Sequence, residues 1–203
     1  KRFDRAFNYE DSTFFGYVYK NKKLDISKFD QVAAIYAILR SDMVATSEAR
    51  LIPESAVTAN FEAMYGENLK YEAKEFEKGT NYNILYTQGS GYSYISNDVV
   101  GIYTPGIKTI NAKTAVDNDK IVVTRKVFYV EYVSNDAGVV TSAVIYNDMN
   151  KQQKLGNVAI SKKGLNEDEI LGKFSSKIST YNFIFKQNSK NNNYALYKIE
   201  RIK

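Results

Sequence analysis

The chain of 203 residues contains neither cysteine nor histidine. It therefore cannot form a disulfide bond, a cysteine nucleophile, a zinc-finger site or a Ser-His-Asp triad. Histidine is also the side chain that most often exchanges protons near neutral pH. The chemistry left to the chain is that of carboxylate pairs, lysine, tyrosine and serine, or of a hard cation held by oxygen ligands.

Tryptophan is absent, and only two prolines, Pro53 and Pro105, interrupt the chain. No apolar run approaches the ~20 residues that are needed to span a bilayer. The first residues, KRFDRAFNYED, are too charged for a secretory signal. Since the chain begins at Lys1 rather than at methionine, we expect a mature or trimmed fragment that an anchor or signal originally preceded.

Hydrophobic residues make up 44% of the chain, enough for a sizeable core, and 17 tyrosines and 11 phenylalanines dominate its aromatic content. The net charge of +5 is uneven, because residues 151–203 hold 11 basic against 4 acidic side chains. A basic end suits an anionic cell-wall polymer, a membrane surface or nucleic acid. The lysines are scattered, however, which favours an ordinary solvated surface.

Three segments have the period of an amphipathic helix. In residues 25–45, Ser27 is the expected cap and Asp30 takes a capping-box position. In residues 52–71, Pro53 fits the first turn and Gly66 supplies a left-handed stop. The third helix is expected at about residues 166–178, with Asn166 as its cap.

Alternation of period two begins after Gly79 and predicts strands. Residues 82–96 read as two short strands around a turn at Gly89 to Gly91, and residues 101–107 as a turn. The strongest strand signal is KIVVTRKVFYVEYV, which we expect to be broken at Arg125-Lys126. A hairpin with Gly138 at its tip follows.

The last segment, residues 179–203, holds two alternating aromatic runs separated by seven polar residues, which predicts a closing hairpin. Each strand is expected to place one set of side chains on a common face: Tyr181, Phe183 and Phe185, and on the return strand Ala195, Tyr197 and Ile199. Ile184, Tyr194 and Leu196 point the other way, so the hairpin is expected to be covered on both sides.

These segments predict one α+β domain over residues 1–203, with a helical part at 1–50 and a mostly β part at 80–203. The expected architecture is an antiparallel, twisted β-sheet on which amphipathic helices pack. By fold analogy, a cystatin-like or nuclear-transport-factor-two-like cone is a specific form of this architecture.

Four stretches carry a family resemblance: FEAMYGENLKYEAKEF, YNILYTQGSGYSYI, IVVTRKVFYVEY with VIYND, and the final hairpin. Over roughly residues 50–203 they resemble a group of uncharacterised, membrane-anchored or exported proteins of Firmicutes and related Gram-positive bacteria. The resemblance implies a location at the outer face of a membrane or in the cell wall. It implies no activity and no catalytic residues, and the anchor typical of the group is not among the residues given.

The candidate binding residues are four tyrosines on the strands around the Gly89 turn: Tyr82, Tyr86, Tyr92 and Tyr94. Tyrosine joins a stacking face to a polar tip, so these side chains are candidates to line a groove for a glycan or peptide. The preferred interpretation of this period-two spacing is that the four tyrosines cover a half-exposed sheet. The cluster TQGSGY lacks the lysine and helix of a phosphate loop, and we interpret it as a hairpin turn.

Other polar stretches favour ordinary structural roles. VDNDK and NEDE lack the spacing of a calcium loop and read as a turn and a helix cap. Glu72, Glu75 and Glu77 read as surface acids, since nothing in the sequence separates their pKa values. No nucleic-acid signature accompanies the basic C-terminal strand.

The sequence therefore offers no catalytic residues, no metal ligands and no cofactor site. The leading expectation is a non-enzymatic, exported or membrane-anchored domain that binds a protein or a cell-surface polymer. One alternative is a small-molecule-binding or enzymatic cone fold with a pocket on its curved sheet. The other is a structural module of an envelope assembly.

Overall fold

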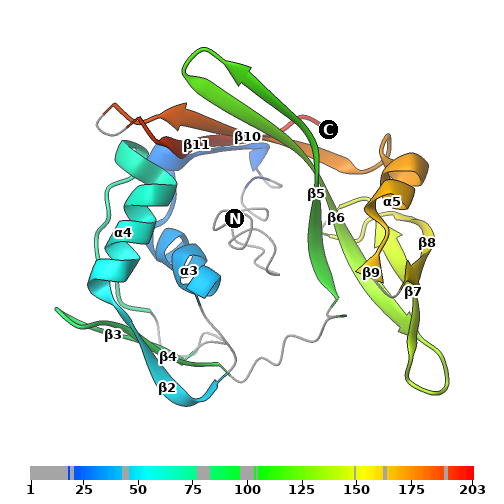
Figure 1. Ribbon diagram of the computed structural model, residues 1–203, viewed down its shortest axis with the longest axis horizontal. Coiled ribbons are helices and arrows are strands. Elements are labelled where there is room, and N and C mark those ends of the chain that lie inside the picture. Colours follow the sequence, from blue (N-terminus) through cyan, green and yellow to red (C-terminus); the bar gives the residue numbers. More distant parts are fainter. Residues whose placement is uncertain are drawn as a thin grey trace.

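The computed structural model describes residues 18, 21–42, 46–76, 83–96, 103, 105–148, 150–161, 164–189 and 192–203. These residues form an α+β structure of antiparallel sheets and packed helices, which confirms the predicted fold class. Figure 1 shows two helices at one side, a long twisted ribbon through the middle and a further helix at the opposite side.

The larger sheet has eight strands, all paired antiparallel. Seven of them follow in spatial order: β1 (Lys23–Asp25), β11 (Tyr194–Arg201), β10 (Ser179–Gln187), β6 (Lys120–Ser134), β7 (Val140–Tyr146), β8 (Lys154–Ser161) and β9 (Gly164–Leu165). The eighth strand, β5 (Gly106–Asp117), pairs with β6 through a two-residue turn. This turn, at Asn118 and Asp119, confirms the interpretation of VDNDK as a turn.

Strand β6 is the axis of the larger sheet. It is bordered by β5 along residues 120–130 on one edge. On the other edge, β10 pairs with residues 120–127 and β7 with residues 129–134, so these two strands lie end to end. The amide of Ser179 joins them by donating to the carbonyl of Asn147 at 2.9 Å.

The predicted break of β6 at Arg125-Lys126 is wrong, because the strand runs through both residues. In the sheet, each of these two cationic side chains lies beside a group that interacts favourably with its charge. The guanidinium of buried Arg125 lies 5.2 Å from the ring centre of Phe183. The ammonium of Lys126 donates to the carbonyl of Ser175 at 2.8 Å and to the hydroxyl of Thr180 at 2.9 Å.

The expected helices are present with shifted boundaries: α3 (Gln31–Asp42), α4 (Glu54–Tyr65) and α5 (Glu167–Phe174). The first helix begins later than predicted. Asp30, and not Ser27, caps α3 by accepting from the amide of Ala33 at 2.8 Å. Ser27 instead lies in a short 3-10 turn, η1 (Ile26–Lys28), which Asp25 caps.

The ends of the other two helices agree with the sequence more closely. Asn166 caps α5 by accepting from the amide of Glu169 at 3.2 Å, which confirms the interpretation of NEDE as a helix cap. Gly66, with φ of 55°, ends α4 as predicted and begins the short 3-10 turn η2 (Gly66–Asn68). The third helix ends at Phe174, earlier than the predicted residue 178.

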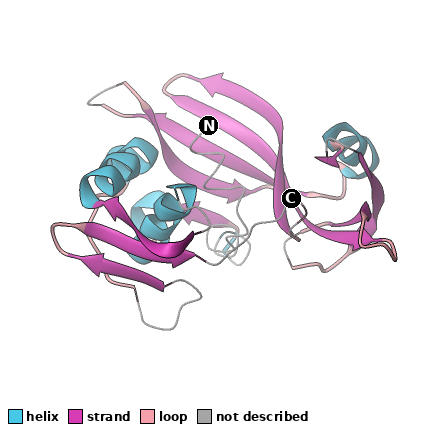
Figure 2. Cartoon of the chain, turned by 60° about the horizontal axis from the view of Figure 1, so that its bottom comes forward, coloured by secondary structure: helices cyan, strands magenta, loops and turns pink. Residues whose placement is uncertain are grey.

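A second, three-stranded sheet has the order β2 (Thr46–Pro53), β4 (Gly91–Ser96) and β3 (Asn83–Thr87). The two predicted strands around Gly89 are therefore confirmed, whereas β2 was not predicted. Figure 2 shows this small sheet and the larger sheet on either side of α3 and α4. One core joins these layers, with Phe61 from α4, Tyr92 from β4 and Leu196 from β11 among its buried residues.

A second core lies under α5. Ile170 and Phe174 of this helix pack with Phe128 and Val130 of β6 and with Ile145 of β7. The first core takes Val127 from β6, and the second takes Phe128, the next residue, and Val130. Because successive strand residues point to opposite faces, the two cores lie on opposite faces of β6.

The closing hairpin is confirmed as β10 and β11, but the predicted face of the return strand is only partly right. Leu196 and Ile199 are both buried in the first core, whereas Tyr197 is 37% exposed. The register shows why, because Phe185 lies opposite Leu196 and Ile184 opposite Lys198. Tyr197 is thus an extra residue, a β-bulge, and the alternation changes face there.

Candidate functional site

The four predicted tyrosines do not form an open groove in the part of the chain that the structure describes. Tyr92 and Tyr94 are fully buried on the inner face of β4, where they pack in the first core. Their rings are therefore unavailable for stacking on a ligand. Tyr86 is half-buried and donates its hydroxyl to Glu54 at 3.1 Å. Tyr82 lies outside the described residues.

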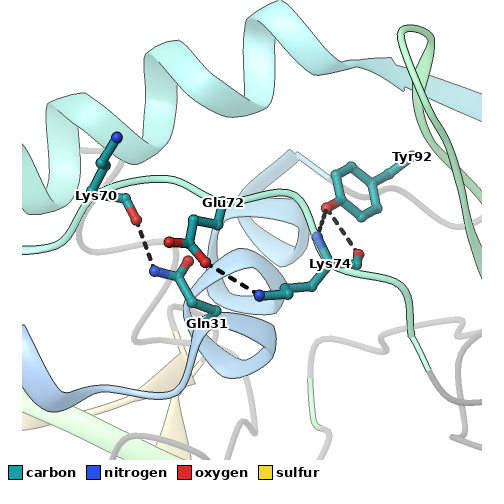
Figure 3. A network of polar contacts seen from close by, with 5 residues as sticks. All are labelled: Gln31, Lys70, Glu72, Lys74 and Tyr92. Atoms are coloured by element: carbon teal, nitrogen blue, oxygen red, sulfur yellow. Dashed lines mark hydrogen bonds and ion pairs between the residues drawn. The ribbon is translucent and has the colours of Figure 1, made fainter.

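Tyr92 has a structural role at its hydroxyl (Figure 3). The oxygen accepts from the amide of Lys74 at 3.1 Å and donates to the carbonyl of the same residue at 3.0 Å. Gln31 of α3 donates to the carbonyl of Lys70 at 2.7 Å. These contacts fasten residues 69–76, which we call the strap, across the helices. The strap has no regular secondary structure.

The acidic residues of the strap are surface acids, as the sequence indicates. Glu72 and Glu75 are exposed, and Glu72 pairs with the ammonium of Lys74 at 3.2 Å. Glu77 lies outside the described residues. Burial raises the pKa of the Tyr71 phenol on the same segment.

A cleft of about 490 Å³ lies beside the strap, at the end of α4. Its lining combines polar and apolar surface in about equal parts, from Glu62, Gly66, Glu67, Leu69, Lys70, Tyr71 and Asn188. Glu67 closes one side by accepting from the amide of Ser189 at 3.2 Å and from its hydroxyl at 2.8 Å. The cleft exceeds the ~300 Å³ at which ligand pockets begin, but such pockets are predominantly apolar. The small-molecule alternative therefore stays a prediction.

A cluster that the sequence analysis did not identify joins β6, β7 and the turn after β7. The ammonium of Lys151 lies 2.6 Å from one carboxylate oxygen of Glu131 and 4.5 Å from the ring centre of Tyr129. The hydroxyl of Tyr146 donates to the other oxygen of Glu131 at 2.7 Å. The pairing of β6 with β7 places Tyr129, Glu131 and Tyr146 side by side, and the turn, with Lys151 at φ of 54°, adds the ammonium. Nothing in the one-dimensional pattern signals that approach.

The electrostatics of this cluster favour a structural role. The hydrogen bond with Lys151 is the main cause that holds the pKa of Glu131 below its ordinary value. The same contact raises the pKa of Lys151, so its amine stays protonated at neutral pH. A protonated, paired amine is a poor nucleophile. The cluster therefore fastens β6 to the turn after β7.

The outer face of the small sheet is an unusual surface. Leu51, Ser93 and Leu85 lie opposite one another on β2, β4 and β3, with Ile95 one pleat further along β4. Leu51 is 55% exposed, Leu85 61% and Ile95 37%. Across seven positions the face carries no charged side chain: Leu51, Pro53, Leu85, Thr87, Gly91, Ser93 and Ile95. We call these seven residues the neutral face.

The sequence contains a signal for the neutral face, which the prediction of helices on either side of Leu51 obscured on β2. On β2, exposed Leu51 is followed by buried Ile52, and on β3 exposed Leu85 follows buried Ile84. Each strand thus shows apolar side chains on both faces. A strand that is apolar on both faces but covered on one indicates a surface available to a partner.

The described residues contain no group of three or more acidic residues that is arranged to hold a metal ion. Within the same ranges, no helix is sufficiently long and apolar to cross a bilayer. No family model, curated protein or solved structure matches this chain, so both the Gram-positive resemblance and the cone form stay predictions.

Proposed function

We propose that this chain is a non-enzymatic binding domain that docks another protein on the neutral face of the small sheet. The observation that carries the proposal is the exposure of Leu51, Leu85 and Ile95 on a face without charge. One quarter of the residues of the chain are charged, so seven positions would carry about two charges on average, and this face carries none. Contiguous apolar surface of this kind is typical of protein contact sites.

The composition of the neutral face favours a protein over a surface polymer. An anionic or hydroxyl-rich polymer is recognised by cationic groups or by many hydrogen-bond donors. Apart from Thr87 and Ser93, the face offers only apolar side chains and glycine. Its matching partner is the uncharged face of a sheet or helix, against which the three aliphatic side chains lose contact with water.

The experiment that tests this function places a photo-crosslinking residue on the surface in cells. With Leu85→p-benzoylphenylalanine we expect discrete protein adducts, and Leu51→Asp in the same chain should abolish them. Val116→p-benzoylphenylalanine is the matched control, since Val116 is 72% exposed near the tip of the β5–β6 hairpin. Identical adducts at both positions, or none at position 85, would refute docking on this face.

A sedimentation assay tests the polymer as occupant. Purified cell walls are mixed with the chain and with its Leu85→Asp variant, whose fold is first checked by circular dichroism. Equal sedimentation of both forms is the expected result. Loss of sedimentation in the variant would assign the face to a polymer and overturn the proposal of a protein partner.

The location belongs to the same proposal and is supported by the sequence resemblance alone. We propose that the domain acts at the outer face of a membrane or in the cell wall. Digestion of intact cells with an added protease should remove the chain while a cytoplasmic marker survives. Survival of both would refute an exterior location and leave the docking proposal untouched.

A further inference from the structure

The cleft at the end of α4 has a wall that two distant segments of the chain build together. Gly66 lies so close to the turn between β10 and β11 that a Cβ on it would stand 2.9 Å from the side-chain nitrogen of Asn188. Glu67 holds the same turn through its two hydrogen bonds with Ser189. The amide of Asn188 donates to the carbonyl of Asn193 at 2.7 Å and so joins the two ends of the turn. The cleft therefore has a preformed shape.

A second, smaller hollow adjoins this cleft on α4. It measures about 190 Å³ and is lined by Ala59, Glu62, Ala63, Asn188, Asn193 and Ala195. Glu62 and Asn188 line both spaces, so the cleft and the hollow meet at these two residues. Adjoining spaces of this kind suit an elongated ligand.

Unpaired charges of opposite sign line the cleft. Among the residues that the structure describes, the carboxylate of Glu62 has no ion-pair or hydrogen-bond partner, and neither has the ammonium of Lys70. The backbone carbonyl of Lys70 is held by Gln31, whereas its ammonium extends in the opposite direction (Figure 3). Because the two charges do not pair with each other, both are available to a ligand.

Glu67 is the other carboxylate of the lining. Its oxygens accept from Ser189 and serve the wall of the cleft rather than a ligand. Its negative charge nevertheless lies on the same cleft, where two carboxylates face one ammonium. This balance favours a ligand with an amino group over a purely anionic one.

The rest of the lining indicates what joins the charged groups of a ligand. Leu69 and the ring of Tyr71 add apolar surface, so the lining is about half polar and half apolar. A neutral sugar would use neither the carboxylate of Glu62 nor the ammonium of Lys70. The volume of about 490 Å³ lies within the range of roughly 300–1,000 Å³ that is usual for small ligands, which accommodates a peptide of a few residues.

We propose that this cleft binds a short peptide with free ends, whose amino group lies at Glu62 and whose carboxylate lies at Lys70. An apolar side chain of the peptide then contacts Leu69 and Tyr71. None of the residues that line the cleft belongs to the neutral face, so this site does not depend on the docking proposed there.

The test uses the tripeptide Ala-Leu-Ala as its probe and follows the whole chain by nuclear magnetic resonance. Saturable shifts are expected at the backbone amides of Glu62, Gly66 and Lys70. The N-acetylated tripeptide and the tripeptide amide should each bind about fivefold more weakly, because each lacks one of the two charges. The tripeptide that is blocked at both ends should bind more weakly than either.

Two variants assign each end of the peptide to its residue. Glu62→Gln should weaken binding of the free tripeptide by about fivefold and leave binding of the N-acetylated form unchanged. Lys70→Gln should do the same for the free tripeptide and leave binding of the tripeptide amide unchanged. The matched controls, Glu167→Gln on α5 and Lys28→Gln on η1, change exposed charges and should bind like the original chain.

Circular dichroism first confirms that each variant is folded. The proposal is overturned if the tripeptide causes no saturable shift at the cleft, or if the peptide blocked at both ends binds equally well. It is also overturned if either variant at the cleft keeps the full preference for the free end that is assigned to it, or if the control variants weaken binding to the same degree.

Discussion

Two glycines at one turn have very different surroundings. Gly89, in the turn between β3 and β4, and Gly91, the first residue of β4, both have positive φ, 75° and 127°. A Cβ on Gly89 would meet no atom within 4 Å. A Cβ on Gly91 would lie 2.3 Å from the carbonyl oxygen of Ile52 and 2.5 Å from the amide nitrogen of Glu54. Only at Gly91 does the backbone of β2 approach too closely for any side chain.

The first prediction follows from this difference. Gly91→Ala should lower the free energy of unfolding by roughly 3 kcal/mol or more, because backbone atoms of β2 and α4 must move apart. Gly89→Ala should cost only about 1 kcal/mol, the penalty of positive φ for a residue with Cβ. Urea unfolding of both variants measures the two costs. Equal costs would show that conformation alone, and not the close approach, requires glycine at position 91.

At the scale of elements, the sequence predicts what depends on local chemistry. Helix caps such as Asn166 and the stop at Gly66 are local, and so are the turns at Gly89 and Gly138. The alternation of hydrophobic side chains identifies the closing hairpin for the same reason. The bulge at Tyr197 is different, because it arises from pairing with β10 and leaves no mark in the pattern of β11 alone.

Strands that depend on distant partners were missed or misjudged. β2 ends at Pro53 and is stabilised by pairing with β4, about forty residues further along the chain. Its sequence, TSEARLIP, lacks alternation, and therefore the helical interpretation of residues 1–50 extended over it. The burial of Tyr92 and Tyr94 also depends on distant helices. The tyrosine pattern identified a sheet face correctly but could not tell that helices cover it.

The cluster that fastens β6 to the turn after β7 gives the second prediction. The pKa of Glu131 lies below its ordinary value of 4.5, chiefly through its hydrogen bond with Lys151. Its contribution to stability is therefore complete above pH 4.5 and is lost as the pH falls through the lower pKa of the folded state. Glu131→Gln should make the free energy of unfolding less sensitive to acid in that range.

Urea midpoints measured from neutral pH to below pH 4.5 test this expectation. Asp136→Asn is the control, since it removes one negative charge from the exposed turn between β6 and β7. A decline with acid that is as steep in Glu131→Gln as in the original chain would contradict the assigned role of the carboxylate.

At the scale of the whole molecule, β6 unites what would otherwise be two separate packing units. It supplies Val127 to the core beneath α3 and α4, and Phe128 and Val130 to the core beneath α5. Each face of β6 is buried in one of the two cores. Detachment of β6 would therefore expose apolar side chains of both cores to water. We therefore expect the chain to unfold as one cooperative structure, despite its two sheets and two cores.

The third prediction tests that unity. Phe183→Ala in the first core and Ile145→Ala in the second should each shift the urea midpoint of the entire chain, since truncation of a buried side chain costs roughly 2–5 kcal/mol. Hydrogen exchange near the midpoint should show β8 and β11 opening together in both variants. Opening of β8 in Ile145→Ala while β11 remains protected would show that the two cores unfold independently.

The pairing of β1 with β11 determines how the domain responds to mechanical load. Lys23 lies opposite Glu200 and Asp25 opposite Lys198, so the start of β1 and the end of β11 meet at the same end of the pair. A force applied to the chain before Lys23 and after Glu200 loads the hydrogen bonds between β1 and β11 one after another, beginning at this end. Tension should thus detach β1 before it disturbs β6, so a modest pull would take Leu24 out of the first core while the second core stays intact.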